Sequence, residues 1–425
     1  MIKSEGRFSP SILIGLILVT LFIVGLLPSC RDRRPRGEAQ PSPAYRIWPS
    51  EPPADCPFPK STDITGLAFT GRHIRYANAD TWYPSWAADG KMYSSWTDGT
   101  VNNIKSDSSG SGAVTGYATI IGDDPLHLEL VDAGVYHANP SPYEGRYPCG
   151  NLVFDGVWYY GTYCLLNSGD PYKGLNWDIL GPFVGFRYST DYGKTWHDTS
   201  HTPKHPIFGE PAKFGGKLKV GVPHFVDFGK NMLYSPDGMA YLVGHGATDP
   251  DPKPRPANLS WITGDQIYMA RVKPSIQNIN DMAKYEFFAG DDAGGMPVWT
   301  HDFSKIKPLV DWNNNCGCVT MTYDPGLRKH LMCITDGVNT VAKFNTYILE
   351  SDRITGPWKL VVYMRSFGEQ GYFVNIPSKF ISADGRTAWL CYSANFTNSY
   401  LHTDYKDIPP GGGYGMTLQE VRLLP

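Results

Sequence analysis

The sequence predicts an all-β protein, a five-bladed β-propeller whose ring is closed by pairing an N-terminal with a C-terminal strand. The first observation is the composition: 425 residues include 45 Gly and 35 Pro, with 13% aromatic residues. Such a chain is typical of many short strands joined by turns rather than of a helical bundle. A formal net charge of −3, without a basic block beyond the N-terminal region, excludes a dedicated nucleic-acid binder.

The second observation is a hairpin that recurs five times between apolar, aromatic-rich runs. Its turns are Asp89-Gly90, Asp155-Gly156, Asp237-Gly238, Asp324-Pro325-Gly326 and Asp384-Gly385. Gly accepts the positive φ of a tight turn, so this pattern is a strong hairpin signal. Each unit has room for four strands, which indicates five blades. One outer strand is missing after the last hairpin, and residues 66–74 can supply it, so that no sheet edge stays open.

A turn motif follows the second hairpin. Ser189, Asp191, Gly193, Thr195 and Trp196 complete the pattern S-x-D-x-G-x-T-W. It resembles the Asp-box of sialidase-like propellers, in which the motif is structural. We therefore expect it to fix a turn and to pack Trp196, not to bind substrate.

The N-terminal region is expected to lie outside the propeller. Residues 1–30 resemble a signal and lipoprotein leader, in which a basic start and an apolar run precede Leu27-Pro28-Ser29-Cys30 and Cys30 is the lipidation site. The arginines that follow Cys30 oppose translocation and favour, as one alternative, a membrane anchor with the domain inside. A cleaved or uncleaved export signal without lipidation is the other alternative. Residues 31–60 are a Pro-rich spacer, and residues 61–425 are the propeller. This arrangement predicts a membrane-anchored lipoprotein of a bacterial cell envelope, periplasmic or surface-exposed.

The candidate site lies where the ends of the two inner strands of each blade converge on one mouth of the channel. We expect the catalytic carboxylates to come from Asp80, Asp98, Glu369 and Asp302. We expect the substrate-binding residues to be Trp82, Arg146, His224, His245 and Tyr372. Aromatic faces stack on sugar rings, and two carboxyl groups at a suitable separation can cleave a glycosidic bond.

Asp80 and Asp98 flank the Asp89-Gly90 hairpin and should be neighbours across it. Two carboxylates that point into one site repel each other, and this repulsion raises the pKa of one of them, as an acid catalyst requires. A change of register by one residue would instead place them on opposite faces.

The segment DTWYPSWAADGKMYSSWTDG, residues 80–99, resembles the opening of the bacterial family labelled domain of unknown function 4185. That family is related to propeller glycoside hydrolases that include endo-D-arabinanases. The resemblance implies a five-bladed fold and a sugar substrate. Among the candidate residues it points to Asp80 and, second, to Asp98.

These patterns together predict an exported glycoside hydrolase, expected to be a monomer, that acts on a polysaccharide or oligosaccharide. The first alternative is a non-catalytic glycan-binding propeller. The second, from another class, is a protein-interaction scaffold, but such scaffolds usually have shorter and more regular repeats than this chain. No arginine cluster for an acidic sugar occurs. No cofactor is expected, although residues 248–254 offer oxygen ligands for a structural Ca²⁺. Cysteine pairs on successive strands, such as Cys149 with Cys164, form either disulfides or small buried thiols.

Overall fold

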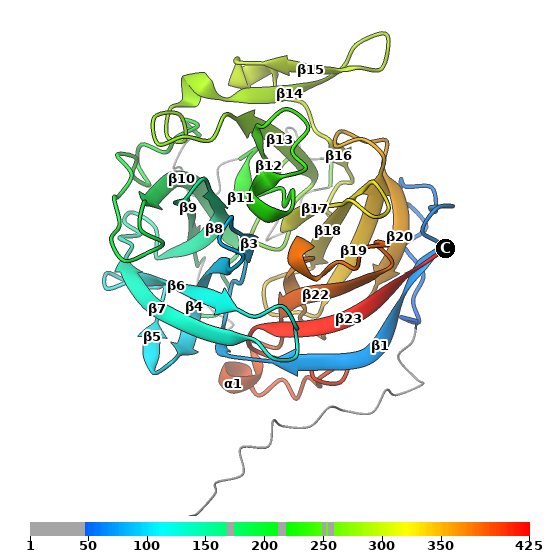
Figure 1. The fold of residues 1–425 in the computed structure, drawn as a ribbon, viewed down its shortest axis with the longest axis horizontal. Coiled ribbons are helices and arrows are strands. Elements are labelled where there is room, and N and C mark those ends of the chain that lie inside the picture. Colours follow the sequence, from blue (N-terminus) through cyan, green and yellow to red (C-terminus); the bar gives the residue numbers. More distant parts are fainter. Residues whose placement is uncertain (1–46, 168–173, 211–217, 249–251, 254–258) are drawn as a thin grey trace, which may run out of the picture. The chain divides into compact units, whose positions relative to one another are not determined.

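A computed structural model describes residues 47–167, 174–210, 218–248, 252–253 and 259–425. The strands of this part of the chain form five antiparallel sheets arranged around a central axis (Figure 1). The predicted five-bladed β-propeller is thus confirmed. Among the described residues, no helix has the length and apolarity that a membrane crossing requires.

Blade 1 contains the first hairpin and also the strands of the long insertion that follows it. Blade 2 has three strands. Blade 1 contains β2 (Asn78–Asp80), β3 (Ser85–Trp86), β4 (Met92–Val101), β5 (Ile104–Ser106), β6 (Val114–Ile121) and β7 (Glu129–His137). Blade 2 contains β8 (Gly145–Phe154), β9 (Val157–Leu166) and β10 (Ile179–Ser189). The inner strands β3 and β8 lie close to the axis (Figure 1).

Blade 3 carries two additional outer strands and a short pairing strand. It contains β11 (Gly221–Phe225), β12 (Ala240–Gly246), β13 (Gln266–Val272), β14 (Glu286–Asp291), β15 (Pro297–Thr300) and β16 (Val310–Asp311). Blade 4 contains β17 (Val319–Asp324), β18 (Lys329–Gly337), β19 (Phe344–Ser351) and β20 (Lys359–Met364). The short helices are η2 (Lys230–Met232), η3 (Met282–Lys284), η4 (Phe303–Lys305), η5 (Ser378–Phe380) and α1 (Asn398–Leu401).

Blade 5 closes the ring. It contains β21 (Tyr372–Asn375), β22 (Thr387–Ser393), β23 (Thr417–Leu424) and, from the other end of the chain, β1 (Gly66–Arg75). β1 pairs antiparallel with β23 from Gly66 opposite Leu424 to Arg75 opposite Thr417, and the two strands lie side by side in blue and red in Figure 1. The predicted closure is confirmed, and it removes the open edge that an incomplete last blade would present.

The turn between β8 and β9 has the conformation that the Asp-Gly pattern predicts. Asp155 and Gly156 have φ angles of 47° and 78°, both left-handed, and the flanking Phe154 and Val157 are paired. A two-residue turn with positive φ at both positions matches the right-handed twist of the strands it connects. The hairpin therefore sets the register of β8 and β9 locally.

The turn after β10 is fixed by its own side chains. Asp191 accepts hydrogen bonds from the backbone N–H of Thr195 at 2.8 Å and from the Thr195 hydroxyl at 2.6 Å. The Ser189 hydroxyl accepts from the Gly193 N–H at 2.8 Å. Trp196 packs on Trp158 with ring centroids 5.1 Å apart. Each of these contacts is internal to the blades, as expected for a structural motif.

Part of the segment expected to be a spacer packs on the propeller. The Trp48 indole is buried and donates to the Arg365 carbonyl at 3.0 Å, and the Ser50 hydroxyl donates to the Tyr363 carbonyl at 2.7 Å. These contacts dock residues 47–50 on blade 4, ahead of the boundary placed at residue 61. Cys30 and the leader lie outside the described residues.

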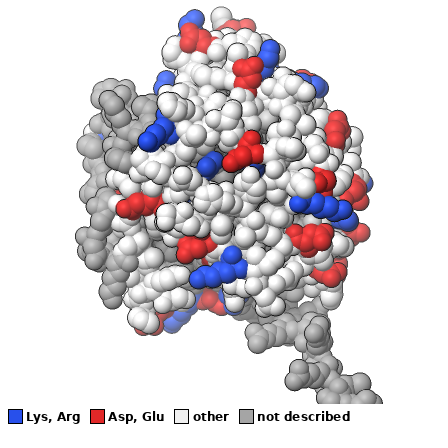
Figure 2. All heavy atoms as spheres, turned by 90° about the vertical axis from the view of Figure 1, so that its left-hand side faces the viewer, with Lys and Arg blue, Asp and Glu red and all other residues white. Residues whose placement is uncertain are grey.

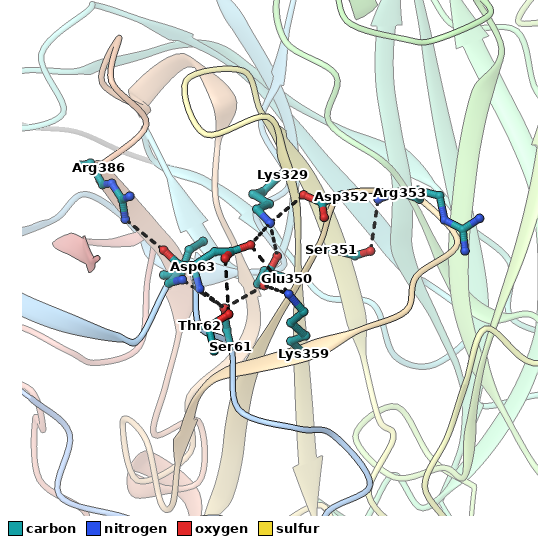
Figure 3. A network of polar contacts seen from close by, with 11 residues as sticks. Ser61, Thr62, Asp63, Lys329, Glu350, Ser351, Asp352, Arg353, Lys359 and Arg386 are labelled. Atoms are coloured by element: carbon teal, nitrogen blue, oxygen red, sulfur yellow. Dashed lines mark hydrogen bonds and ion pairs between the residues drawn. The ribbon is translucent and has the colours of Figure 1, made fainter.

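An ion network holds the start of the propeller on blade 4 (Figure 3). The buried Lys329 ammonium pairs with Glu350 at 3.1 Å, with Asp352 at 2.7 Å and also with Asp63. The Ser61 hydroxyl donates to Glu350 at 2.8 Å. Since β1 begins directly after these residues, the network positions the strand that closes the ring.

The described cysteines are all free, and six of these seven are buried. The pairs considered from the sequence are therefore small buried thiols in this part of the chain. Charged side chains of both signs are scattered over the described part of the face in Figure 2, with no large field of one sign.

Candidate functional site

A cavity of about 350 Å³ opens at one mouth of the propeller, and its lining combines acids with aromatic rings. Its lining residues come from blades 1, 2 and 5, with Trp261 added from the segment between β12 and β13 of blade 3. The acids and aromatic residues of the lining are Asp80, Asp98, Asp107, Tyr147, Tyr163, Trp177, Trp261, Tyr372, Phe373, Phe396, Tyr400 and Tyr414. A cavity of this size and mixed character is typical of a small-molecule site.

Asp80 ends β2 and is buried in the cavity wall. Its Oδ1 accepts a hydrogen bond from the Thr81 hydroxyl at 2.7 Å, and its Oδ2 accepts from the Tyr372 hydroxyl at 2.8 Å. Burial, followed by the charge of Asp98, raises the pKa of Asp80 well above its ordinary value. The carboxyl group is therefore protonated over a wider pH range than an exposed aspartate.

Asp98 is turned toward the same cavity by a bulge in β4. Asn78 is opposite Thr100 and Asp80 is opposite Thr97, so two residues of β4 face one residue of β2. Asp98 itself has φ of 47°. A bulge adds a residue to one strand and redirects its side chains. The bulge accounts for how both carboxylates reach one cavity although they are not directly paired.

Gly99 permits the close approach of the strands at this bulge. A Cβ at this position would lie 1.9 Å from the Asn78 carbonyl oxygen. The Asp98 carboxylate accepts hydrogen bonds from the Ser108 backbone N–H and hydroxyl, both at 2.8 Å. Burial nevertheless raises the pKa of Asp98 to about 6. The two neighbouring acids are thus held with different affinities for a proton, as acid and base partners require.

Aromatic side chains surround the two acids. Tyr147 and Trp177 meet edge to face at 5.9 Å on the blade 2 side, and Trp261 meets Tyr372 at 5.2 Å on the other. Tyr400 lies on α1 and is 64% exposed at the edge of the cavity. Flat apolar faces that end in a polar rim suit a ligand with both C–H and hydroxyl surfaces.

Two of the predicted binding residues lie elsewhere in the fold. Trp82 is buried in the core, where it stacks on Trp96 at 6.4 Å and donates to the Ala79 carbonyl at 2.7 Å. Arg146 is buried and donates from Nε to the Thr162 hydroxyl at 2.8 Å. Neither residue is part of the cavity lining.

The two predicted histidines are buried and neutral. Burial lowers the pKa of His224 to about 3 and that of His245 to about 4. His224 packs on Tyr83 with ring centroids 3.8 Å apart, next to the axis. His245 donates from Nε2 to the Ser260 carbonyl at 2.6 Å. Neither histidine belongs to the cavity lining, so neither touches its contents.

The other two predicted carboxylates are also outside the cavity lining. Glu369 forms an ion pair with Lys343. Asp302 accepts from the backbone N–H of Ser304 at 3.0 Å at the start of η4 and pairs with Lys305 at 3.5 Å. The hydrogen bonds from Ser304 lower the pKa of Asp302. The structure therefore brings Asp80, Asp98 and Tyr372 together and leaves the other six candidates outside.

Several lining residues are absent from the sequence-based prediction. Asp107 and Lys105 belong to the long insertion of blade 1, and Trp177, Trp261 and Tyr414 lie in segments between strands. These segments carry no repeat, so their place at the mouth could not be derived from the hairpin pattern. The signal available was the clustering of aromatic residues within long insertions.

Most of residues 248–254, the segment expected to offer oxygen ligands for Ca²⁺, lies outside the described part of the chain. Among the described residues, no group of three or more His, Cys, Asp or Glu side chains is placed to hold a metal ion.

Comparison with known proteins shows similarity to solved structures alone: no family model and no curated sequence matches the chain. A putative hydrolase from Bacteroides ovatus is 12% identical with TM-score 0.46, over 88% of this chain and 95% of that one. A GH43_1 enzyme from Xanthomonas citri is 12% identical with TM-score 0.43, over 82% and 88%. An α-L-arabinofuranosidase from Podospora anserina, solved with cellotriose, is 12% identical with TM-score 0.40, over 89% and 97%. The fold assignment rests on the strand pairing itself.

Proposed function

We propose that this protein hydrolyses a glycosidic bond of a saccharide bound in the cavity. The observation that carries the proposal is the pair of neighbouring acids in an aromatic cavity, Asp80, which is buried, and Asp98, which is half-buried. Glycoside hydrolysis requires one carboxylic acid to protonate the leaving oxygen and one carboxylate as base or nucleophile. Environments that separate two pKa values distinguish these roles.

Asp80 is assigned the acid role because its pKa is the more strongly raised of the two. It sits beside the Tyr372 hydroxyl, which stabilises the anion left after proton transfer. Asp98, with a pKa of about 6 and two hydrogen bonds from Ser108, is the carboxylate partner above that pH. Activity should therefore rise as the pH passes about 6.

The lining favours an uncharged saccharide. Among the residues that the structure describes, three aspartates and one lysine, Lys105, line the cavity, and no arginine does. A substrate carboxylate would meet like charges there without the bidentate guanidinium contact that such groups usually receive. The faces of Trp177, Trp261 and Tyr400 supply the stacking surface for sugar rings.

The test is a screen of the purified protein on plant, algal and bacterial glycans for released reducing ends, followed by Asp80→Asn on each hit. This substitution keeps the shape of the side chain but removes proton transfer, so turnover should fall at least ~10²-fold. Asp198→Asn, at an exposed aspartate, is the matched control and should keep full activity. A folded Asp80→Asn protein with full activity would remove Asp80 from the mechanism. Binding without hydrolysis of any glycan would favour a carbohydrate-binding propeller instead.

The same proposal places the protein in the cell envelope, attached through a lipid on Cys30, with the propeller as a monomer. The support is the leader sequence that ends in Leu27-Pro28-Ser29-Cys30. Cys30→Ser should abolish labelling with a fatty acid and release the protein from membranes. If the unmodified protein takes up no label, lipid anchoring is wrong.

A further inference from the structure

We infer that the cavity receives the free end of a glycan chain and not an internal segment of it. This inference rests on the proposed function and concerns its mode of attack. It follows from segments of blades 3 and 4 that cover the channel mouth beside the cavity and leave a blind end.

The first part of this wall is the segment 259–264 of blade 3, which lies over blade 4. The Ile262 carbonyl accepts from the Gly337 N–H at 3.1 Å. A Cβ on Gly317, just before β17, would lie 2.2 Å from the same oxygen. His245 also donates a hydrogen bond to this segment, at the Ser260 carbonyl, at 2.6 Å. The inner end of blade 4 is therefore covered by backbone.

Trp261 is the face that this segment presents to the cavity. Its buried indole packs against Phe344 of blade 4 at 5.6 Å and against Tyr372 and Phe396 of blade 5 at 5.2 Å and 5.7 Å. It lines the cavity while contacting two other blades. The indole thus fills the path from Asp80 toward blade 4.

The second part of the wall joins blade 2 to blade 4. The Thr340 hydroxyl donates to the Asn176 side-chain oxygen at 2.9 Å, and both residues are buried. Leu175, beside Asn176, lines the cavity. Because residues 174–177 and 338–343 belong to different blades, this contact bridges the mouth beside the cavity.

The third part joins the segment 338–343 to blade 5. The Gln370 side-chain N–H donates to the Ala342 carbonyl at 3.1 Å, and its oxygen accepts from the Thr397 hydroxyl at 2.9 Å. Lys343 and Glu369 add an ion pair next to this contact. The wall is therefore continuous from blade 2 through blade 4 to blade 5.

A glycan that ran across the propeller axis would have to pass through this wall. No residue of blade 4 lines the cavity. The cavity volume of about 350 Å³ lies near the lower end of the ~300–1,000 Å³ range of small-molecule sites. Both acids belong to blade 1, on the open side, together with the exposed Lys105 and Asp107. Tyr400 stands at that open edge, where a chain would enter. The geometry admits one chain end.

The test follows product size on linear arabinan, xylan, mannan and β-glucan and on their oligosaccharides. Attack at chain ends should release one short product from the first minutes while the mean size of the polymer stays nearly constant. A ladder of intermediate lengths with early collapse of polymer size would overturn the inference while leaving glycoside hydrolysis intact.

Binding separates the two proposals when nothing is hydrolysed. Each oligosaccharide is compared with derivatives blocked by a bulky group at one terminal sugar, at the other, and at both. If blocking one end of the oligosaccharide abolishes binding and no hydrolysis is detected, the result supports the inference and counts against the proposed hydrolysis. Binding unchanged with both ends blocked overturns the inference, and a panel without binding or hydrolysis overturns both proposals.

Variants test the wall itself. Thr340→Val removes the hydroxyl that joins blades 2 and 4, and Trp261→Ala removes the indole that fills the path. Both variants should shift the products from a single short sugar toward a series of oligosaccharides of intermediate lengths. The control for Thr340→Val is Thr335→Val, which loses a buried hydroxyl contact within blade 4. The control for Trp261→Ala is Trp358→Ala, because Trp358 is as buried as Trp261, at 6% exposure, but lies outside the cavity lining. An unchanged product pattern in folded Thr340→Val and Trp261→Ala proteins would contradict the wall.

Discussion

The Tyr372 hydroxyl donates a hydrogen bond to the Asp80 carboxylate at 2.8 Å, although the two residues are 292 positions apart. The bond joins β2 of the first blade to β21 of the last. Closure of the ring is what brings these strands together, because β1 completes blade 5 and leads directly into blade 1. The strand pairing that stabilises the propeller therefore also assembles its candidate site.

Tyr372→Phe should shift the pH profile of hydrolysis while the protein remains folded. The phenol stabilises ionised Asp80, so its loss should raise the pKa of that carboxyl further. The alkaline limb of the profile, where the acid loses its proton, should move to higher pH. The measurement is kcat against pH on a substrate found in the screen.

The control for this change is Tyr285→Phe, in which a buried tyrosine loses its hydrogen bond to the Ile279 carbonyl, away from the cavity. Its profile should match that of the unmodified protein. An alkaline limb that stays in place in Tyr372→Phe would contradict the assignment of Asp80 as the acid.

Asp98→Asn should make stability less dependent on pH. Burial raises the pKa of Asp98 to about 6, above the ~3.9 of an unfolded chain. Between these values the folded state binds more protons than the unfolded state, so its stability falls as the pH rises. The variant should gain on the unmodified protein between about pH 4 and pH 7, by at most ~2 kcal/mol because the side chain is only half-buried.

Urea unfolding of both proteins at the two ends of this pH range gives the difference directly. A free energy of unfolding of Asp98→Asn that falls relative to that of the unmodified protein as the pH rises would have the wrong sign. Loss of activity in the variant at every pH is expected as well, since the carboxylate partner of Asp80 is gone.

Leu67→Ala should show how much the closing strand contributes. Leu67 is fully buried in β1, opposite Leu423 of β23. Removing a buried leucine costs about 2–5 kcal/mol. Ile47→Ala, at a position 61% exposed, should change stability by less than about 0.5 kcal/mol. Equal free energies of unfolding for the two variants would mean that β1 contributes little to the fold.

Lys329→Met should loosen the contact between residues 61–63 and blade 4. It leaves the buried Glu350 carboxylate without its 3.1 Å ion pair (Figure 3). We expect a loss of at most about 3 kcal/mol, because Lys359 stays within 3.8 Å of Glu350. Lys60→Met breaks an exposed pair with Glu51 and should cost less than about 1 kcal/mol. A Lys329→Met protein as stable as Lys60→Met would show that the network does not hold this segment.

The sequence alone predicted the features that depend on short stretches of chain. A tight turn is decided by the φ angles of two neighbouring residues, so Asp155-Gly156 and its counterparts reveal the hairpins and, through their number, the blades. The closing role of residues 66–74 follows from counting strands. Asp80 and Asp98 could be predicted to be neighbours because one hairpin separates them.

Only the tertiary structure decided which residues share the cavity and how the acids behave. Tyr414, Trp177 and Trp261 reach the cavity from segments without a repeat, while Trp82 and His224 turn into the core. A pKa depends on what surrounds a group, and the residues that surround Asp80 come from blades 1 and 5. The blind end depends on contacts such as Thr340 with Asn176, 164 residues apart. Local turn chemistry can be read along the chain, but burial is set by segments that meet only when the ring closes.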